Sequence, residues 1–332
     1  MEYQSIISEM KQGKYRPIYF LHGEEPYFID KITSYIEQNA LDEDAKGFNQ
    51  HVVYGKDNQV DTSQIISLAK GFPMFGDRLV VIVKEAQHLK DIDDLLSYVL
   101  QHQPSTVLVI NYKYKKYDGK KKLAKELKKQ DYLFESKSLY DNQVPAWIQS
   151  AMKAKGYQIG QKASFLLSEF LGTDLGRIEQ ELDKLSLLIA PGGEVSEDLI
   201  EKNVGISKDF NNFELQKAIG SKNIFKSNQI IQYFSANPKS NPMVVTTSVL
   251  YSFFSKLLLF HGLKNKSDAV KVMGVNPYFI KDYEMAARNF DLRKSVRIIG
   301  YLRDADARSK GIGNTSTSDG ELLKELLFKI LH

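Results

Sequence analysis

The chain has 332 residues, of which 42% are apolar and 26% are charged, enough to build buried cores in two or three domains. It has no cysteine, which excludes disulfides and thiolate metal sites. The formal net charge of +4 is too small to require a nucleic-acid partner, so the placement of the charges matters more than their sum.

The first 140 residues predict a doubly wound α/β domain, because apolar runs typical of strands alternate with helical patterns. Several runs are continuous rather than alternating, which is typical of a parallel sheet covered on both faces. The predicted strands are Pro17–Leu21, His51–Tyr54, Leu79–Val83, Thr106–Ile110 and Tyr132–Phe134. The predicted helices between them are Tyr27–Asn39, Thr62–Lys70, Asp91–Gln101 and Lys120–Lys129.

The chain from Pro145 onward predicts helices and almost no strand. We expect one small helical domain over residues 141–208 and a second over 209–332, with Asp291 as a helix N-cap in the latter. The predicted helices are Ala146–Lys155, Gln161–Phe170, Asp174–Ala190, Glu197–Val204, Glu214–Ile219, Ile224–Ser235, Pro242–Gly262, Tyr278–Asn289, Asp291–Asp306 and Gly320–Leu331.

The turn after the first strand is the position at which a nucleotide-binding phosphate loop would lie. A phosphate loop needs two glycines, a lysine and a hydroxyl at fixed spacing, so that backbone amides and the lysine meet the phosphates. Here only Gly23 is present, and Glu24 and Glu25 would repel phosphate. The six histidines are isolated and lack metal-ligand spacing. We therefore predict no catalytic residue, no cofactor and no metal site.

An unusually apolar turn lies at Gly71–Arg78, where Phe72, Met74 and Phe75 stand between two glycines beside a proline. One interpretation is that these side chains cap the domain's own core. The other is that they form an exposed apolar surface for a partner's pocket, where each buried side chain would contribute roughly 1.5–3 kcal/mol. The residues alone leave both interpretations open.

Two cationic segments indicate possible phosphate contacts. The stretch Lys113–Gln130 has nine lysines against two acids, which fits either a solvated helix face or a phosphate-contacting patch. It has no arginine, which argues against base-specific readout. A second set precedes the polar connector Gly311–Ser318. The candidate phosphate contacts are Lys113, Lys115, Lys116, Lys120, Lys121, Lys122, Arg308 and Lys310.

Several segments, taken in order, resemble the delta subunit of the bacterial DNA polymerase III clamp loader. The resemblance spans nearly the whole chain, and the collinear order of the segments is more specific than any one of them. The matching segments are Tyr19–Tyr27, Phe72–Ile82, the lysine-rich stretch from Lys113, Gly172–Leu185, Met273–Ile280, Ala286–Phe290 and Ala305–Gly311.

The resemblance implies an AAA+-like (RecA-like parallel sheet) domain without a Walker A motif over residues 1–140, which binds the clamp. A lid-like helical domain over 141–208 and a helical collar or oligomerisation domain over 209–332 would follow. Phe72, Met74 and Phe75 would enter a hydrophobic pocket of the sliding clamp. Ile312 is a departure, because some members place an aromatic residue there that could stack on a DNA end.

The resemblance also implies a function. The chain would bind and open the clamp for loading onto primed DNA, while neighbouring ring subunits hydrolyse ATP. It would have no ATPase site of its own, and polymerase activity would belong to it only within the holoenzyme. Its partners would be the sliding clamp, the ATPase and other ring subunits, and primer-template DNA, with no membrane.

Two other functions remain open from the residues. A degenerate P-loop NTPase would need a phosphate loop, which Gly23–Tyr27 lacks. A stand-alone nucleic-acid-binding protein would bind DNA tightly, with a steep salt dependence. The first residues have no basic segment followed by an apolar one, and stretches such as Val249–Phe260 are too short or too interrupted to span a membrane. We therefore expect a cytoplasmic protein.

Overall fold

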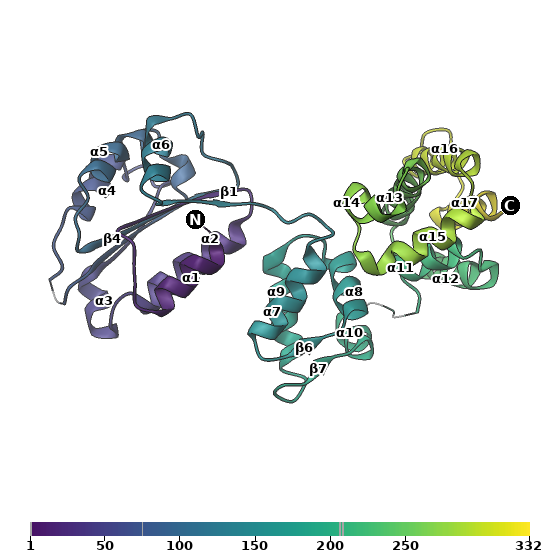
Figure 1. Ribbon diagram of the computed structural model, residues 1–332, viewed down its shortest axis with the longest axis horizontal. Coiled ribbons are helices and arrows are strands. Elements are labelled where there is room, and N and C mark those ends of the chain that lie inside the picture. The colour runs from purple at the N-terminus through teal and green to yellow at the C-terminus, as the bar shows by residue number, and fades with distance from the viewer. Residues whose placement is uncertain (1, 75, 206, 208) are drawn as a thin grey trace. The chain divides into compact units, whose positions relative to one another are not determined.

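The computed structural model describes residues 2–74, 76–205, 207 and 209–332. The chain divides into two compact units, Met1–Leu139 and Tyr140–His332. The first unit is α/β and the second is almost entirely helical, which confirms the predicted fold class (Figure 1). The further division of the helical part at residue 208 stays a prediction.

The N-terminal unit is built on a five-stranded parallel sheet with the order β2-β3-β4-β1-β5. The strands are β1 (Ile18–Gly23), β2 (Gln50–Tyr54), β3 (Leu79–Lys84), β4 (Thr106–Lys113) and β5 (Leu133–Ser136). The helices are α1 (Tyr3–Lys11), α2 (Pro26–Asn39), α3 (Glu43–Asn49), α4 (Thr62–Ala69), η1 (Ala86–His88), η2 (Ile92–Asp94), α5 (Leu95–Leu100) and α6 (Lys122–Lys129).

Both faces of this sheet are buried, as the continuous apolar runs predict. Successive side chains of a strand point to opposite faces, so Ile18 and Phe20 pack with α4, α5 and α6 while Tyr19 and Leu21 pack with α1 and α2. Helices therefore cover the sheet on both sides. Because all five strands run parallel, their carboxyl ends share one edge of the sheet and their amino ends share the other.

Three helices of this unit, α1, α3 and the short η1, were not predicted. Helix α1 buries only Ile6 and Met10, which is too short an apolar stripe to stand out in the sequence. It is held by Arg16, whose guanidinium donates two hydrogen bonds of 2.9 Å to Glu9 and also contacts Asp131. The predicted helix Asp91–Gln101 is wrong in part, since it is divided into η2 and the shorter α5.

The C-terminal unit contains helices and one two-stranded ladder. The first part holds α7 (Val144–Ala154), α8 (Gln161–Leu171), α9 (Leu175–Ser186), α10 (Glu197–Val204) and the strands β6 (Gln158–Ile159) and β7 (Glu194–Val195). The rest holds α11 (Asn212–Gly220), α12 (Ile224–Ala236), α13 (Met243–Gly262), η3 (Lys266–Asp268), α14 (Ala269–Met273), η4 (Pro277–Phe279), α15 (Ile280–Asn289), α16 (Leu292–Ser309) and α17 (Asp319–Leu331).

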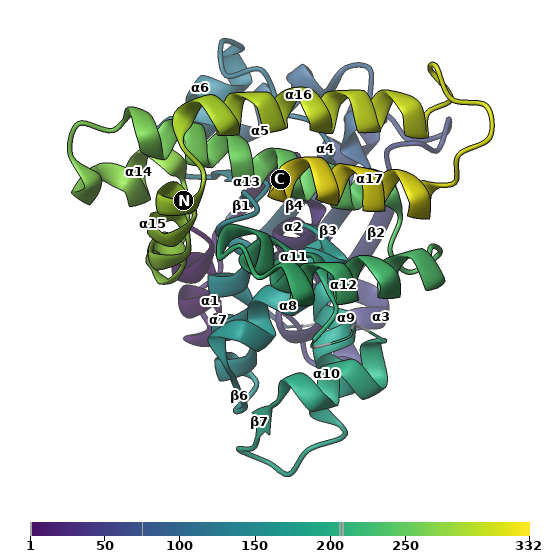
Figure 2. The same cartoon turned by 90° about the vertical axis from the view of Figure 1, so that its right-hand side faces the viewer.

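Details of these helices follow local chemistry. Asp291 is the N-cap of α16, as predicted, and its carboxylate accepts the Lys294 N–H at 2.6 Å. Helix α9 ends at Ser186 instead of Ala190, and Leu187 beyond it is exposed. Helices α13, α16 and α17 lie side by side (Figure 2). Buried side chains, many of them leucine and phenylalanine, fill the core between them.

Among the described residues, α13 is the helix that is long and apolar enough to cross a membrane, by length and composition alone. The core helix of a soluble protein passes the same test. Met243, Leu250, Phe254 and Phe260 of α13 are buried against the neighbouring helices. The apolar composition of this helix is accounted for in part by its central place in the bundle.

Candidate functional site

The apolar turn, Gly71–Arg78, carries exposed aromatic and aliphatic side chains. Phe72 is 78% exposed and Met74 is 70% exposed. The interpretation in which they cap the domain's own core therefore does not describe these two residues. Phe75, the third predicted member, lies outside the described residues. Exposed side chains of this size, side by side on one turn, are unusual on a protein surface without a partner.

The apolar turn is anchored at several points. The N–H of Met74 donates to Oδ1 of Asn49 at 2.8 Å, and Asn49 is fully buried at the end of α3. Arg78 donates from Nη1 to the carbonyl of Ala40 at 2.8 Å, and its guanidinium lies 4.4 Å from the centroid of the Tyr15 ring. The turn is thus tied to α3 through the Met74 amide and to the end of α2 through the Arg78 side chain, while the side chains of Phe72 and Met74 are exposed.

The apolar turn and the candidate lysines lie on opposite edges of the sheet. The turn leads into the amino end of β3, whereas the lysines of the segment 113–121, here called the lysine loop, begin at the carboxyl end of β4. Strand β4 has eight residues and so spans about 25 Å. The two surfaces can therefore contact different partners at the same time.

At the turn after β1 the backbone packs closely against β5, and a carboxylate occupies the N-terminus of α2. A Cβ built on Gly23 would lie 1.9 Å from the carbonyl oxygen of Ser136, so the backbone approaches β5 too closely for any side chain. The carboxylate of Glu25 caps α2 by accepting the Tyr27 N–H at 2.9 Å, and Pro26 has no N–H to offer. The buried Glu25 carboxylate thus takes the amide that a phosphate would use.

The lysine loop is joined to the carboxyl end of β1. In this sheet the connection from β1 leads toward β2, and the connection from β4 leads in the opposite direction, toward β5. A topological switch point therefore lies between β1 and β4. Ligands of α/β proteins bind at such points. Lys115 forms a backbone bridge with Gly23, and the Tyr117 N–H donates to Nδ1 of His22 at 3.1 Å. Burial lowers the pKa of His22, which favours the neutral ring that can accept this hydrogen bond.

The candidate lysines fall into two groups. Three of them form ion pairs within the unit, which are Lys113–Asp30, Lys116–Glu135 at 2.7 Å and Lys121–Asp93 at 2.6 Å. The other three, Lys115, Lys120 and Lys122, are exposed and have no carboxylate within 4 Å in the described part of the chain.

The two cationic candidates of the C-terminal unit are paired. Nη1 of Arg308 lies 2.8 Å from both carboxylate oxygens of Glu325, which ties α16 to α17. Lys310 lies 2.6 Å from the Asp306 carboxylate, one turn earlier on α16. A phosphate would have to compete with these carboxylates. Ile312, in the connector that follows, is exposed.

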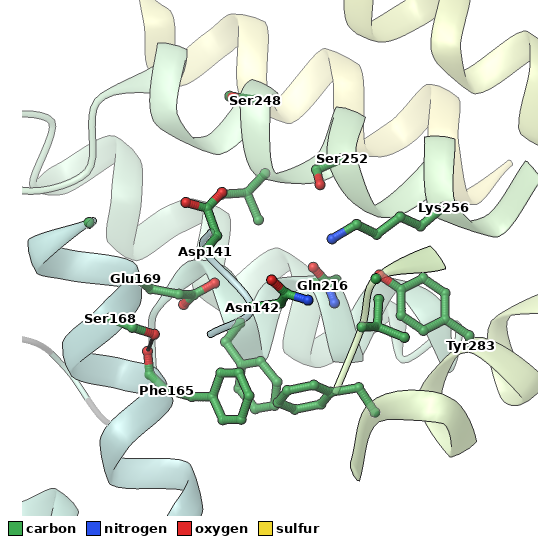
Figure 3. Close-up of a pocket in the computed structure, with 16 residues that line it drawn as sticks. Asp141, Asn142, Phe165, Ser168, Glu169, Gln216, Ser248, Ser252, Lys256 and Tyr283 are labelled. Atoms are coloured by element: carbon green, nitrogen blue, oxygen red, sulfur yellow. Dashed lines mark hydrogen bonds between the residues drawn. The ribbon is translucent and has the colours of Figure 1, made fainter. Parts of the chain in front are cut away.

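A cavity of about 350 Å³ lies in the C-terminal unit and has no counterpart in the sequence predictions. Figure 3 shows Glu169 of α8 and Lys256 of α13 pointing into it, with Gln216 and Tyr283 nearby. These residues come from four helices far apart in the sequence, so no local pattern could reveal them. In the described residues no group of three or more His, Asp or Glu side chains is arranged to hold a metal ion.

Comparison with known proteins decides the family. The chain is 30% identical to the DNA polymerase III subunit delta of Bacillus subtilis over 339 aligned positions, which cover 97% of this chain and 94% of that protein. The chain belongs to the DNA polymerase III delta subunit family. The family's sequence profile, described as DNA polymerase III, delta subunit, matches residues 19–137, a range that includes the apolar turn and the lysine loop.

Two further matches support the same assignment. The delta subunit of Escherichia coli is 22% identical over 268 positions, covering 80% of this chain and 75% of that protein. The solved structure of the DNA clamp loader delta protein of Bacillus subtilis matches 99% of both chains, with a TM-score of 0.57 and 26% identity. As a delta subunit, this chain is a component of the polymerase III clamp loader and acts in DNA replication.

Sequence reasoning missed two residues that the structure makes prominent in this delta subunit. Asn49 looks like an ordinary helix-terminal residue until its contact with Met74, 25 positions away, is known. Tyr114 is inconspicuous within the lysine-rich stretch, but it is exposed and has a positive φ angle. A backbone conformation of this kind leaves no local sequence signal when the residue is not glycine or asparagine.

Proposed function

We propose that this delta subunit binds the sliding clamp through the apolar turn and opens it for loading onto primed DNA. The observation that supports this most directly is the exposure of Phe72 and Met74 on a turn whose backbone is anchored by Asn49. Phe75, which follows Met74 in the sequence, belongs to the same proposed contact. Three such side chains, each buried in an apolar pocket, would contribute several kcal/mol, at roughly 1.5–3 kcal/mol each.

Opening of the clamp would follow from differential affinity. If the apolar turn binds the open interface of the clamp more tightly than the closed one, binding shifts the population toward the open state. The subunit needs no ATP for this step. The hydrogen bonds from the turn to α3 and to the end of α2 support the proposal, because an anchored turn loses less conformational entropy on binding than a mobile one.

We propose further that the chain has no ATPase site of its own and that neighbouring ring subunits hydrolyse ATP. The capping of α2 by Glu25 and the backbone bridge between the lysine loop and Gly23 support this. Residues 1–140 would be the AAA+-like clamp-binding domain, 141–208 the lid-like domain and 209–332 the collar that joins the ring. Assembly of the ring and loading of the clamp would take place in the cytoplasm.

Contacts to primer-template DNA within the complex are the least specific part of the proposal. Lys115, Lys120 and Lys122 are the stronger candidates, because nearby carboxylates already neutralise Lys113, Lys116 and Lys121. Arg308 and Lys310 would contact phosphate only if they exchange their carboxylate partners for it.

The test is calorimetric titration of the full chain with the sliding clamp from the same genome. A Met74→Ala, Phe75→Ala double variant should lose measurable binding while its unfolding curve stays normal. The matched control is Tyr54→Ala, which removes a partly exposed aromatic ring at the opposite edge of the same sheet and should bind like the original chain. Equal binding by the double variant would refute the apolar turn as the clamp contact without affecting the family assignment.

A further inference from the structure

Tyr114 is the most unusual residue of the lysine loop. Its side chain is 65% exposed, and its backbone has a φ angle of +65°. Positive φ angles are uncommon outside glycine and cost an ordinary residue free energy. Such a conformation persists only where the surrounding structure imposes it, and residues of this kind cluster at functional sites.

The surrounding structure does impose it, because the chain is fixed on both sides of Tyr114. Before it, the Lys113 N–H donates to Oε1 of Gln87 at 3.2 Å, and the Lys113 ammonium pairs with Asp30. After it, Lys115 bridges to Gly23 and the Tyr117 N–H donates to His22. These contacts hold the backbone in place and leave the Tyr114 ring projecting into solvent.

Three lysines follow Tyr114 in the sequence. Lys115 follows it directly, with its ammonium 5.2 Å from the centroid of the Tyr112 ring, and Lys120 and Lys122 follow within the same loop and at the start of α6. All three are exposed, and the described residues place no carboxylate within 4 Å of them. Exposed aromatic rings combined with exposed cationic side chains are the means by which proteins hold single-stranded nucleic acid without reading its sequence.

We propose that Tyr114 stacks on an unpaired base of single-stranded DNA, while Lys115 and Lys120 contact the phosphates on either side. A single strand fits better than a duplex, because a tyrosine ring can stack only on a base whose face is free. The lack of arginine in residues 113–130 fits binding that does not depend on base identity. The inference extends the proposed DNA contact, and it is independent of the clamp contact at the opposite edge of the sheet.

The experiment measures fluorescence anisotropy of a labelled oligothymidylate titrated with the full chain, at several salt concentrations. Tyr114→Gly removes the ring and suits the positive φ angle, so the loop keeps its fold. We expect this variant to bind about 5- to 150-fold more weakly, the range for loss of one stacked base. Tyr114→Phe keeps the ring and should bind like the original chain.

The salt dependence separates stacking from charge. Tyr114→Gly removes no charge, so the slope of log affinity against log salt should stay the same. The Lys115→Ala, Lys120→Ala double variant should reduce the magnitude of that slope by about 0.7 for each phosphate that a lysine no longer neutralises. Tyr140→Ala, which removes an exposed tyrosine from the other unit, is the matched control and should change neither quantity.

Three outcomes would overturn the inference. The first is a Tyr114→Gly variant that binds the oligonucleotide as tightly as the original chain. The second is a Tyr114→Gly variant that loses as much affinity for a blunt duplex as for the single strand, which would indicate a contact to duplex DNA instead. The third is no binding by the original chain, which would favour an acidic protein partner for this surface. Clamp binding by the same preparations tests the proposed function separately, since the apolar turn is unchanged in all of these variants.

Discussion

Replacement of Asn49 by alanine tests the anchoring of the apolar turn. Oδ1 of Asn49 accepts the Met74 N–H at 2.8 Å, and Asn49 is fully buried while the Met74 side chain is exposed. Alanine removes the acceptor and leaves the partly buried amide without this partner. Leaving a donor unsatisfied costs about 1–3 kcal/mol, which the turn can avoid only by moving the amide out to water.

The predicted magnitude follows from that cost. Protection of the Met74 amide against hydrogen exchange should fall by about 5- to 150-fold in Asn49→Ala, since each 1.4 kcal/mol corresponds to a factor of ten. Clamp affinity should fall in the same direction and by no more than this factor, because the apolar side chains are intact and only their ordering is weakened.

The assay is hydrogen exchange followed by mass spectrometry on the peptide that contains residues 71–79, together with calorimetric titration of the clamp. Exchange in β3 and β4 serves as the internal control and should not change. A Met74 amide that exchanges equally fast in both proteins would refute the anchoring role of Asn49. Unchanged clamp affinity, with exchange accelerated as expected, would show that order in the turn does not limit binding.

Two further predictions concern the N-terminal unit. Gly23→Ala should lower the free energy of unfolding in urea by at least about 2 kcal/mol, because its Cβ would lie 1.9 Å from the Ser136 carbonyl oxygen and the φ angle of Gly23 is +142°. An unchanged urea midpoint of unfolding would contradict the close approach of Gly23 to Ser136. Arg16→Gln should cost about 0.5–1.5 kcal/mol at pH 7, since hydrogen bonds from Arg16 lower the pKa of Glu9 and of Asp131. Stability from lowered carboxyl pKa values is present above their unfolded values and is lost as pH falls. The difference in the free energy of unfolding between the original chain and Arg16→Gln should therefore shrink below about pH 4. A difference that grows there would refute the predicted direction of the pH dependence.

The proposed clamp contact and the proposed single-strand contact lie at opposite edges of the sheet, so the sheet topology would allow both to form in one subunit. The apolar turn precedes β3 and the lysine loop follows β4, so they occupy the amino and carboxyl edges of a parallel sheet. A variant at one edge should leave binding at the other edge unchanged, since side chains separated in this way share no partner. This separation makes the two proposals independently testable in one protein.

The sequence by itself was sufficient for the fold class, an α/β part followed by helices, and for the family. Runs such as Leu79–Val83 and Thr106–Ile110 are continuous and apolar, and only a parallel sheet covered on both faces buries both sides of such strands. The collinear segments were enough to identify the delta subunit resemblance. Helices α1 and α3 were missed because short helices that bury two residues or fewer leave little periodic signal.

The tertiary structure alone decided which side chains are available to a partner. An apolar turn has the same composition whether it caps its own core or projects from it, and only the packing around Asn49 and Ala40 shows that Phe72 and Met74 project. Likewise, adjacent lysines look equivalent in sequence, but Asp30, Glu135 and Asp93 approach three of them from distant parts of the chain. Exposure and charge pairing depend on contacts between residues far apart in the chain, which local patterns do not encode.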